Sequence, residues 1–143
     1  MLRFNSDHKF KIMQIADTQE IPAVSPDTLS LINNALDREK PDLVIFTGDQ
    51  IKGYSKKFKK DPVIIESTID ILVEPIAKRN IPFMVTYGNH DAQCGVDNRG
   101  QYKFYAKYDN FISGDLRNSD DVGTADIQIY SSTEDKPVFE LSL

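Results

Sequence analysis

The chain has 143 residues, of which 40% are hydrophobic and 27% are charged, as is usual for a globular domain. Its formal net charge of −5 argues against nucleic acid as the main partner, because duplex binding normally needs a basic face. No apolar run reaches the ~18 residues of a membrane span, and no signal-peptide core precedes Lys9, so we expect a cytoplasmic protein without a membrane partner. The single cysteine, Cys94, excludes an internal disulfide framework.

The first part of the chain predicts a strand followed by a helix. Lys9 to Asp17 is an apolar-rich run of strand length that ends in a polar residue. Ser25-Pro26-Asp27 then combines an N-cap serine, a proline at the first helical position and an acid in the first turn, which together indicate a helix start. Pro41 predicts that this helix ends near Lys40.

The next segment repeats the pattern. Asp42 to Thr47 is continuously apolar and rich in β-branched residues, which is typical of a strand buried on both faces of a parallel sheet. Asp61-Pro62 opens a second helix, with a kink or break predicted at Pro75, and Ile81 to Thr86 is a third strand. The fold class is therefore α/β, a right-handed βαβαβ unit with a parallel sheet.

The remaining segments predict a helix over residues 101–111 and a pair of strands at 125–130 and 137–143, joined by a hairpin-like turn. The aromatic residues of that helix are interpreted as packing groups rather than substrate-stacking groups. The loops at 50–61 and 92–121 are the expected source of specificity. The first contains a lysine cluster at 56–60, for which a solvated loop is the simplest interpretation and a landing surface for an anionic substrate the alternative.

Polar groups follow each of the three predicted parallel strands. Asp17 ends the first, Asp49 ends the second after a glycine, and Asn89-His90-Asp91 ends the third. Asp17 and Asp49, each taken alone, are compatible with ordinary turn chemistry, whereas Asn89-His90-Asp91 after Gly88 is harder to explain in that way. Because ligand sites of open α/β sheets lie at the carboxyl ends of the strands, we expect the three groups to converge.

Oxygen ligands with one imidazole suit divalent cations such as Mn²⁺, Fe²⁺ or Zn²⁺. A carboxylate at the middle strand end, such as Asp49, can bridge two ions, and two ions can activate water for attack on a phosphoryl group. A neighbouring histidine, such as His90, can protonate the leaving group. The glycine-rich loops of nucleotide-binding folds and the elbow of serine hydrolases are missing from the sequence.

Residues 15–19, 46–49 and 87–91 resemble the first three sequence blocks of the calcineurin-like metallophosphoesterases, which read Asp-x-His, Gly-Asp and Gly-Asn-His-Asp/Glu. Within this family, the sequence most resembles bacterial phosphohydrolases related to the purple acid phosphatases. The resemblance implies a four-layer α/β/β/α sandwich. It also implies hydrolysis of a phosphorylated small molecule or another phosphoester at a two-metal centre.

The same resemblance implies a role for each matching residue. Asp17 would bind the first metal ion, Asp49 would bridge both ions and Asn89 would bind the second. His90 would contact the phosphate and act as the acid, and Asp91 would orient His90.

Two departures from the family pattern stand out. Gln19 occupies the position of a histidine ligand, and its amide is a weaker ligand for Zn²⁺ or Fe²⁺. The later histidine blocks are missing, since the chain contains only His8, expected at the surface, and His90. We therefore interpret residues 1–143 as a single metallophosphoesterase domain that is incomplete at its C-terminus. Its last strand would leave an open sheet edge that favours self-association. A non-catalytic binding or interaction module is the alternative.

Overall fold

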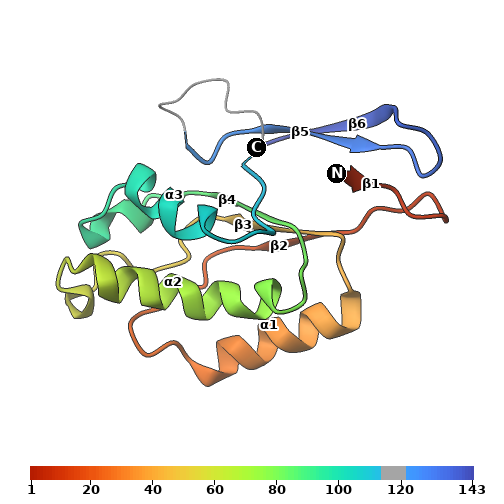
Figure 1. Cartoon of the computed structure of the whole chain (residues 1–143). Coiled ribbons are helices and arrows are strands. Elements are labelled where there is room, and N and C mark those ends of the chain that lie inside the picture. Colours follow the sequence, from red (N-terminus) through yellow and green to blue (C-terminus); the bar gives the residue numbers. More distant parts are fainter. Residues whose placement is uncertain (114–121) are drawn as a thin grey trace.

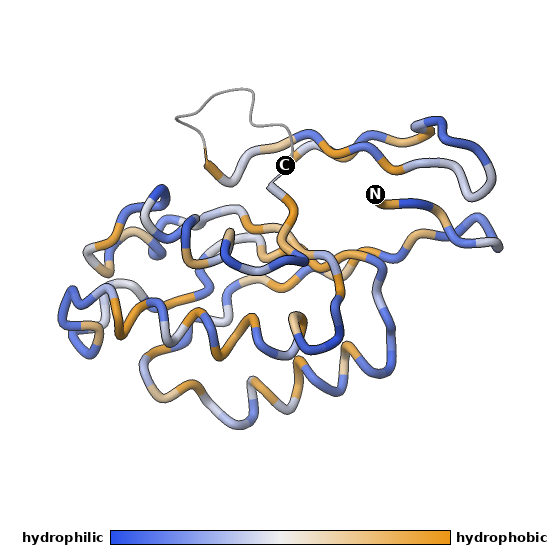
Figure 2. Tube along the Cα trace, viewed as in Figure 1, coloured by the Kyte–Doolittle hydropathy of each residue, from blue (hydrophilic) through white to orange (hydrophobic). Residues whose placement is uncertain are grey.

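The structure is a computed structural model, and it describes residues 1–113 and 122–143. Helices, a parallel sheet and a second sheet follow one another as three layers (Figure 1). Hydrophobic residues concentrate on the central strands and on the inner sides of the helices (Figure 2). Within the described residues, no helix is long and apolar enough to cross a membrane.

The central sheet has the predicted parallel topology. Its strands are β2 (Ile12–Ile15), β3 (Leu43–Thr47) and β4 (Phe83–Thr86), paired in the order β2-β3-β4. The helices α1 (Pro26–Glu39) and α2 (Pro62–Ala77) connect them. This arrangement confirms the βαβαβ unit and the α/β fold class.

Both helices begin where the sequence predicts. The Ser25 hydroxyl accepts a hydrogen bond from the Asp27 amide at 3.3 Å, and the Asp61 carboxylate accepts one from the Val63 amide at 2.9 Å. The predicted break at Pro75 is wrong, because α2 continues through it to Ala77. Pro75 lacks an amide hydrogen and so removes only its own hydrogen bond to the preceding turn, and α2 ends two residues later at Ala77.

The continuous apolar character of β3 follows from its position between two layers. Val44 and Phe46 belong to the core shared with the helices. Leu43 and Ile45 instead pack with Ile127 of the second sheet. Alternate side chains of one strand therefore serve two cores, which is why the strand shows no polar alternation.

The second sheet pairs β1 (Leu2–Arg3), β5 (Asp126–Tyr130) and β6 (Pro137–Ser142) in the order β1-β5-β6. Its antiparallel β5–β6 hairpin confirms the predicted pair of strands. Strand β1 was not predicted, because two residues are too short for a periodic pattern. Its Arg3 guanidinium donates hydrogen bonds to the Ser131 and Glu134 carbonyl oxygens, at 2.6 Å and 2.8 Å, and so ties β1 to the hairpin turn.

The segment after β4 differs from the prediction. A short 3₁₀ helix, η2 (Asp91–Cys94), precedes α3 (Asn98–Ala106), which begins and ends earlier than the predicted helix at 101–111. The Asp97 carboxylate caps α3 by accepting from the Gly100 amide at 2.7 Å, a start signal that the sequence analysis overlooked. Tyr105 is buried in the helical core, which confirms a packing role for this aromatic residue. Residues 114–121 of the expected specificity loop lie outside the described residues.

Candidate active site

The three polar strand ends meet at the carboxyl edge of the central sheet, at the left of Figure 1. The Asp17 amide donates to the Gly48 carbonyl oxygen at 3.1 Å, and the Gln19 amide donates to the Asp49 carbonyl oxygen at 3.0 Å. The His90 amide donates to Asp49 Oδ1 at 2.8 Å. Asp49 therefore links the loops that follow β2 and β4, and the structure brings the predicted residues together.

Three of the four predicted metal ligands have a left-handed backbone. The φ angles are 53° at Asp17, 47° at Gln19 and 53° at Asp49. This conformation costs a non-glycine residue about 1 kcal/mol or more. Left-handed residues occur at functional sites and also at helix ends, such as Lys40 after α1.

Two glycines allow the loops to approach this closely. A Cβ atom on Gly88 would lie 2.1 Å from Asp49 Oδ1, and one on Gly48 would lie 2.5 Å from the Gly88 amide nitrogen. Any larger residue would push the Asp49 carboxylate out of place. The glycines of the Gly-Asp and Gly-Asn-His-Asp blocks are thus required by packing around Asp49.

Asp91 is a buried clamp on the backbone. It is 2% exposed, and its Oδ2 accepts from the Asp49 and Gly88 amides, each at 2.8 Å. Its Oδ1 accepts from the amides of Gln50 at 2.9 Å and Ile51 at 3.3 Å. Burial raises the pKa of the Asp91 carboxyl, and the hydrogen bonds from the backbone amides oppose part of that rise.

The hydrogen bonds to both Asp91 oxygens come from backbone amides and not from the His90 ring. The ring is positioned instead by Gln93, whose Oε1 lies 3.0 Å from His90 Nδ1. The Tyr54 ring packs edge-on against it, with ring centroids 4.9 Å apart. On the other side, Asn89 Nδ2 lies 3.3 Å from His90 Nε2. The position of Gln93, three residues after His90, was the only sequence signal for this contact.

Two buried amides hold the loops of the site and were not predicted. Gln50, 1% exposed, donates from Nε2 to the carbonyl oxygens of Ile15 at 3.1 Å and Gly48 at 2.7 Å. Gln101, also 1% exposed, donates from Nε2 to the carbonyl oxygens of Asp91 at 2.8 Å and Val96 at 2.9 Å. Both residues act through the backbone rather than by facing the site.

The donor set fits a hard divalent cation but supplies few ligands. Across residues 1–113 and 122–143, no group of three or more His, Cys, Asp or Glu side chains is placed to hold an ion. Of the four predicted ligands, Gln19 and Asn89 carry amides, and only Asp17 and Asp49 carry carboxylates. Amide and carboxylate oxygens suit Mn²⁺ better than they suit softer ions.

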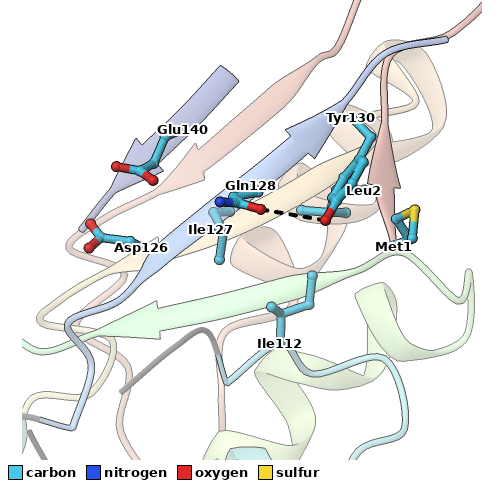
Figure 3. Close-up of a pocket in the computed structure, with 8 residues that line it drawn as sticks. All are labelled: Met1, Leu2, Ile112, Asp126, Ile127, Gln128, Tyr130 and Glu140. Atoms are coloured by element: carbon cyan, nitrogen blue, oxygen red, sulfur yellow. Dashed lines mark hydrogen bonds between the residues drawn. The ribbon is translucent and has the colours of Figure 1, made fainter. Parts of the chain in front are cut away.

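A separate cavity of about 470 Å³ lies on the second sheet (Figure 3). Asp126 and Glu140 line it together with Met1, Leu2, Ile112 and other β5 residues. Two carboxylates in its wall would repel a phosphate group. Because none of the strand-end residues lines it, this cavity is not part of the candidate active site.

Comparison with known proteins supports the same interpretation. Residues 10–138 match the family model of the calcineurin-like phosphoesterases. "Probable inactive purple acid phosphatase 14" of Arabidopsis thaliana is 28% identical over 128 residues, covering 78% of this chain and 31% of that protein. Phosphatase DCR2 of Saccharomyces cerevisiae is 33% identical over 105 residues, covering 63% of this chain and 17% of that protein.

A crystal structure of a dimetal phosphatase from Danio rerio shares the fold, with a TM-score of 0.57 at 16% identity over 83% of this chain and 40% of that chain. The chain spans less than a third of the length of each of the two curated relatives, the Arabidopsis thaliana and Saccharomyces cerevisiae proteins. The family match covers most of the chain and includes every predicted site residue. The chain belongs to the calcineurin-like phosphoesterase family.

Proposed function

We propose that this chain contributes the Asp17, Asp49 and His90 side of a metal-dependent phosphoesterase site that hydrolyses a phosphate ester. The observation that carries the proposal is the position of Asp49. Its carboxylate lies at the middle strand end, is 9% exposed, and is held by the His90 amide. A buried carboxylate between two loops that carry further oxygen ligands is the arrangement expected of a ligand shared by two ions.

In this proposal, Asp17, Gln19, Asp49 and Asn89 hold two divalent ions, Mn²⁺, Fe²⁺ or Zn²⁺. When bound, such ions lower the pKa of a coordinated water and stabilise negative charge on phosphoryl oxygens. The left-handed backbone at Asp17, Gln19 and Asp49 presents these side chains from the strand ends. Asn89 directs its amide nitrogen toward His90, which leaves Oδ1 outside that contact and available as a ligand oxygen.

We propose that His90 contacts the phosphate and protonates the leaving group. Gln93 and Tyr54 restrain its ring, so that the imidazole keeps one direction without support from Asp91. Asp91, which the sequence analysis assigned to catalysis, is better described as a positioning residue. It holds the amides of Asp49 and Gly88, and through them the bridging carboxylate.

Hydrolysis of an aryl phosphate by the protein in the presence of Mn²⁺ tests this function. We expect metal-dependent turnover that falls by at least about 100-fold in Asp49→Asn and in His90→Ala. Thr133→Ala, a change at an exposed position of the hairpin turn, serves as the control and should leave turnover unchanged. A folded protein that shows no metal-dependent hydrolysis contradicts the enzymatic proposal.

A non-catalytic binding module is the second candidate. Gln19 in place of a histidine ligand favours it, and some relatives carry the word inactive in their names. In that case, calorimetry would show Mn²⁺ binding that Asp49→Asn removes, while hydrolysis would be missing. A folded protein with neither metal binding nor hydrolysis would contradict both candidates.

We also infer that the described residues act as one domain. The two hydrophobic cores share β3, because Val44 and Phe46 face one core while Leu43 and Ile45 face the other. Separating the layers would expose apolar side chains of the same strand. A single cooperative unfolding transition seen by both far-UV and tyrosine signals is the expected result, and two separate transitions would contradict it.

A further inference from the structure

The lysine-rich loop between β3 and α2 forms one wall of a pocket beside His90. The pocket has a volume of about 260 Å³. Its lining includes Tyr54 and Gln93, which both contact the His90 ring. The other lining residues are Gly53, Ser55, Lys56, Lys59, Lys60 and Cys94. The pocket therefore adjoins the proposed phosphate position through shared side chains.

The lysines of this pocket, Lys56, Lys59 and Lys60, form no ion pair with an acidic side chain of the described residues. By contrast, Lys107 contacts both Glu66 and Asp70. In a chain with a net charge of −5, an unpaired group of ammonium ions creates a local positive potential that attracts anions.

The loop is held in place rather than loosely attached. Phe58 is 1% exposed and anchors the short 3₁₀ helix η1 (Lys56–Phe58) in the core. A Cβ atom on Gly95 would lie 2.9 Å from Lys60 Cβ, so the Lys60 stem packs directly against the loop after η2. A Cβ atom on Gly53 would lie 2.0 Å from the His90 carbonyl oxygen, which shows how closely the loop lies on the site.

The backbone of the loop is also strained. Lys59 and Lys60 are consecutive non-glycine residues in the left-handed region, with φ angles of 54° and 55°. Asparagine and glycine adopt this conformation more readily than lysine does. Lys59 is the left-handed C-cap of η1, so this backbone conformation fixes the path of the chain at Lys59 and Lys60.

We propose that this pocket binds a second phosphate group of the substrate. The substrate class is then a phosphoester that carries a further phosphate, such as an organic diphosphate, rather than a simple monophosphate. One phosphate lies at the metal site beside His90, and the other lies among Lys56, Lys59 and Lys60. This inference rests on the proposed function for its substrate, but the anion pocket itself does not require bound metal.

The test is a nuclear magnetic resonance titration of the ¹⁵N-labelled chain with inorganic phosphate and with pyrophosphate, in buffer containing a metal chelator. We expect saturable shifts of the backbone amides of residues 53–60 and 93–95, with pyrophosphate binding more tightly than phosphate. Neutralising the pocket in Lys56→Gln/Lys59→Gln/Lys60→Gln should weaken pyrophosphate binding by at least about tenfold.

The matched control is Lys9→Gln/Lys103→Gln/Lys136→Gln, which removes the same charge from exposed lysines outside the pocket. It should weaken binding by less than about twofold if the pocket is specific, because distant surface charges are screened. Equal losses in both triple variants, or shifts spread over lysines throughout the chain, would overturn the proposal.

A parallel Mn²⁺ titration without chelator separates this inference from the proposed function. Loss of Mn²⁺ binding in Asp49→Asn with unchanged metal-free pyrophosphate binding supports two adjoining sites. Absence of Mn²⁺ binding in the wild type would contradict the metal site alone and leave the pocket result standing.

Discussion

The carboxyl edge of the central sheet and the outer sheet β1-β5-β6 are stabilised in different ways. At the carboxyl edge, the buried Asp91 carboxylate accepts four backbone hydrogen bonds, and its neighbours keep strained backbones. The outer sheet relies on a local hairpin and on Arg3 at its turn, and leaves Val138 and Phe139 about half exposed.

This difference separates the region that we propose performs chemistry from the region that we expect to offer a contact surface. A buried polar network fixes the positions of its side chains, but it destabilises the fold unless every buried polar group has a hydrogen-bond partner. Within residues 1–113 and 122–143, β6 (Pro137–Ser142) is an edge strand, and an edge strand can pair with another chain through the backbone groups of its outer side. The predictions below test each half of this contrast.

The largest expected effect is on folding stability at Asp91. Asp91→Asn should lower the free energy of unfolding by about 3 kcal/mol, because an amide nitrogen would face backbone donors that the carboxylate now satisfies. Asp135→Asn, which removes an exposed ion pair with Arg3 in the outer sheet, should cost less than about 1 kcal/mol. Urea denaturation of both variants measures the difference, and equal losses would contradict the contrast.

The pH dependence of the free energy of unfolding should include a contribution from the titration of Asp91. The pKa of Asp91 is raised above 3.8 in the folded state, mainly by burial, so the folded state holds this proton more tightly than the unfolded state does. The Asp91 contribution is thus fully present below its unfolded pKa, and is lost as the pH rises through the folded pKa. Its slope cannot exceed about 1.4 kcal/mol per pH unit, the limit for one proton.

Unfolding of wild type and Asp91→Asn across pH 3 to 7 isolates this contribution from the other carboxyl groups. Asp37 and Glu39 have lowered pKa values because of their contacts with Arg79 and Arg38, and they are present in both proteins. We expect the wild type to lose stability relative to Asp91→Asn as the pH rises above 3.8. A parallel pair of curves would contradict this assignment.

The smallest effect concerns self-association through β6. We expect the average mass in light scattering to rise with concentration for the wild type, and to rise less for Phe139→Lys, since a charged edge resists pairing. Val63→Lys, at a 73% exposed apolar position on α2, should associate like the wild type. A strictly monomeric wild type at all concentrations would contradict the prediction.

The helix starts and parallel strands were predictable because their signals are local. Ser25 and Asp61 cap helices through amides only two residues away, and the continuous apolar run of β3 indicates a buried strand by itself. Strand β1 was missed because its stability comes from pairing with β5, more than 120 residues away. The start of α3 was misplaced because the aromatic spacing was given more weight than the Asp97 cap.

The convergence of the candidate site residues was predictable from the sequence, but their detailed contacts were not. Asp17, Asp49 and His90 each follow a predicted parallel strand, and the parallel topology brings these strand ends together. No sequence pattern reveals a left-handed backbone at Asp17, or that Asp91 binds amides rather than His90. Those features depend on contacts between loops about 40 residues apart in the chain.

Calorimetric titration of the folded chain with Mn²⁺, for the wild type and for Asp49→Asn, tests the central claim most directly. The account predicts saturable binding to the wild type and at least about 100-fold weaker binding to Asp49→Asn, while Asp126→Asn on the outer sheet binds like the wild type. Identical binding to wild type and Asp49→Asn, or no binding to the folded wild type, would contradict a metal site at the carboxyl ends of β2, β3 and β4.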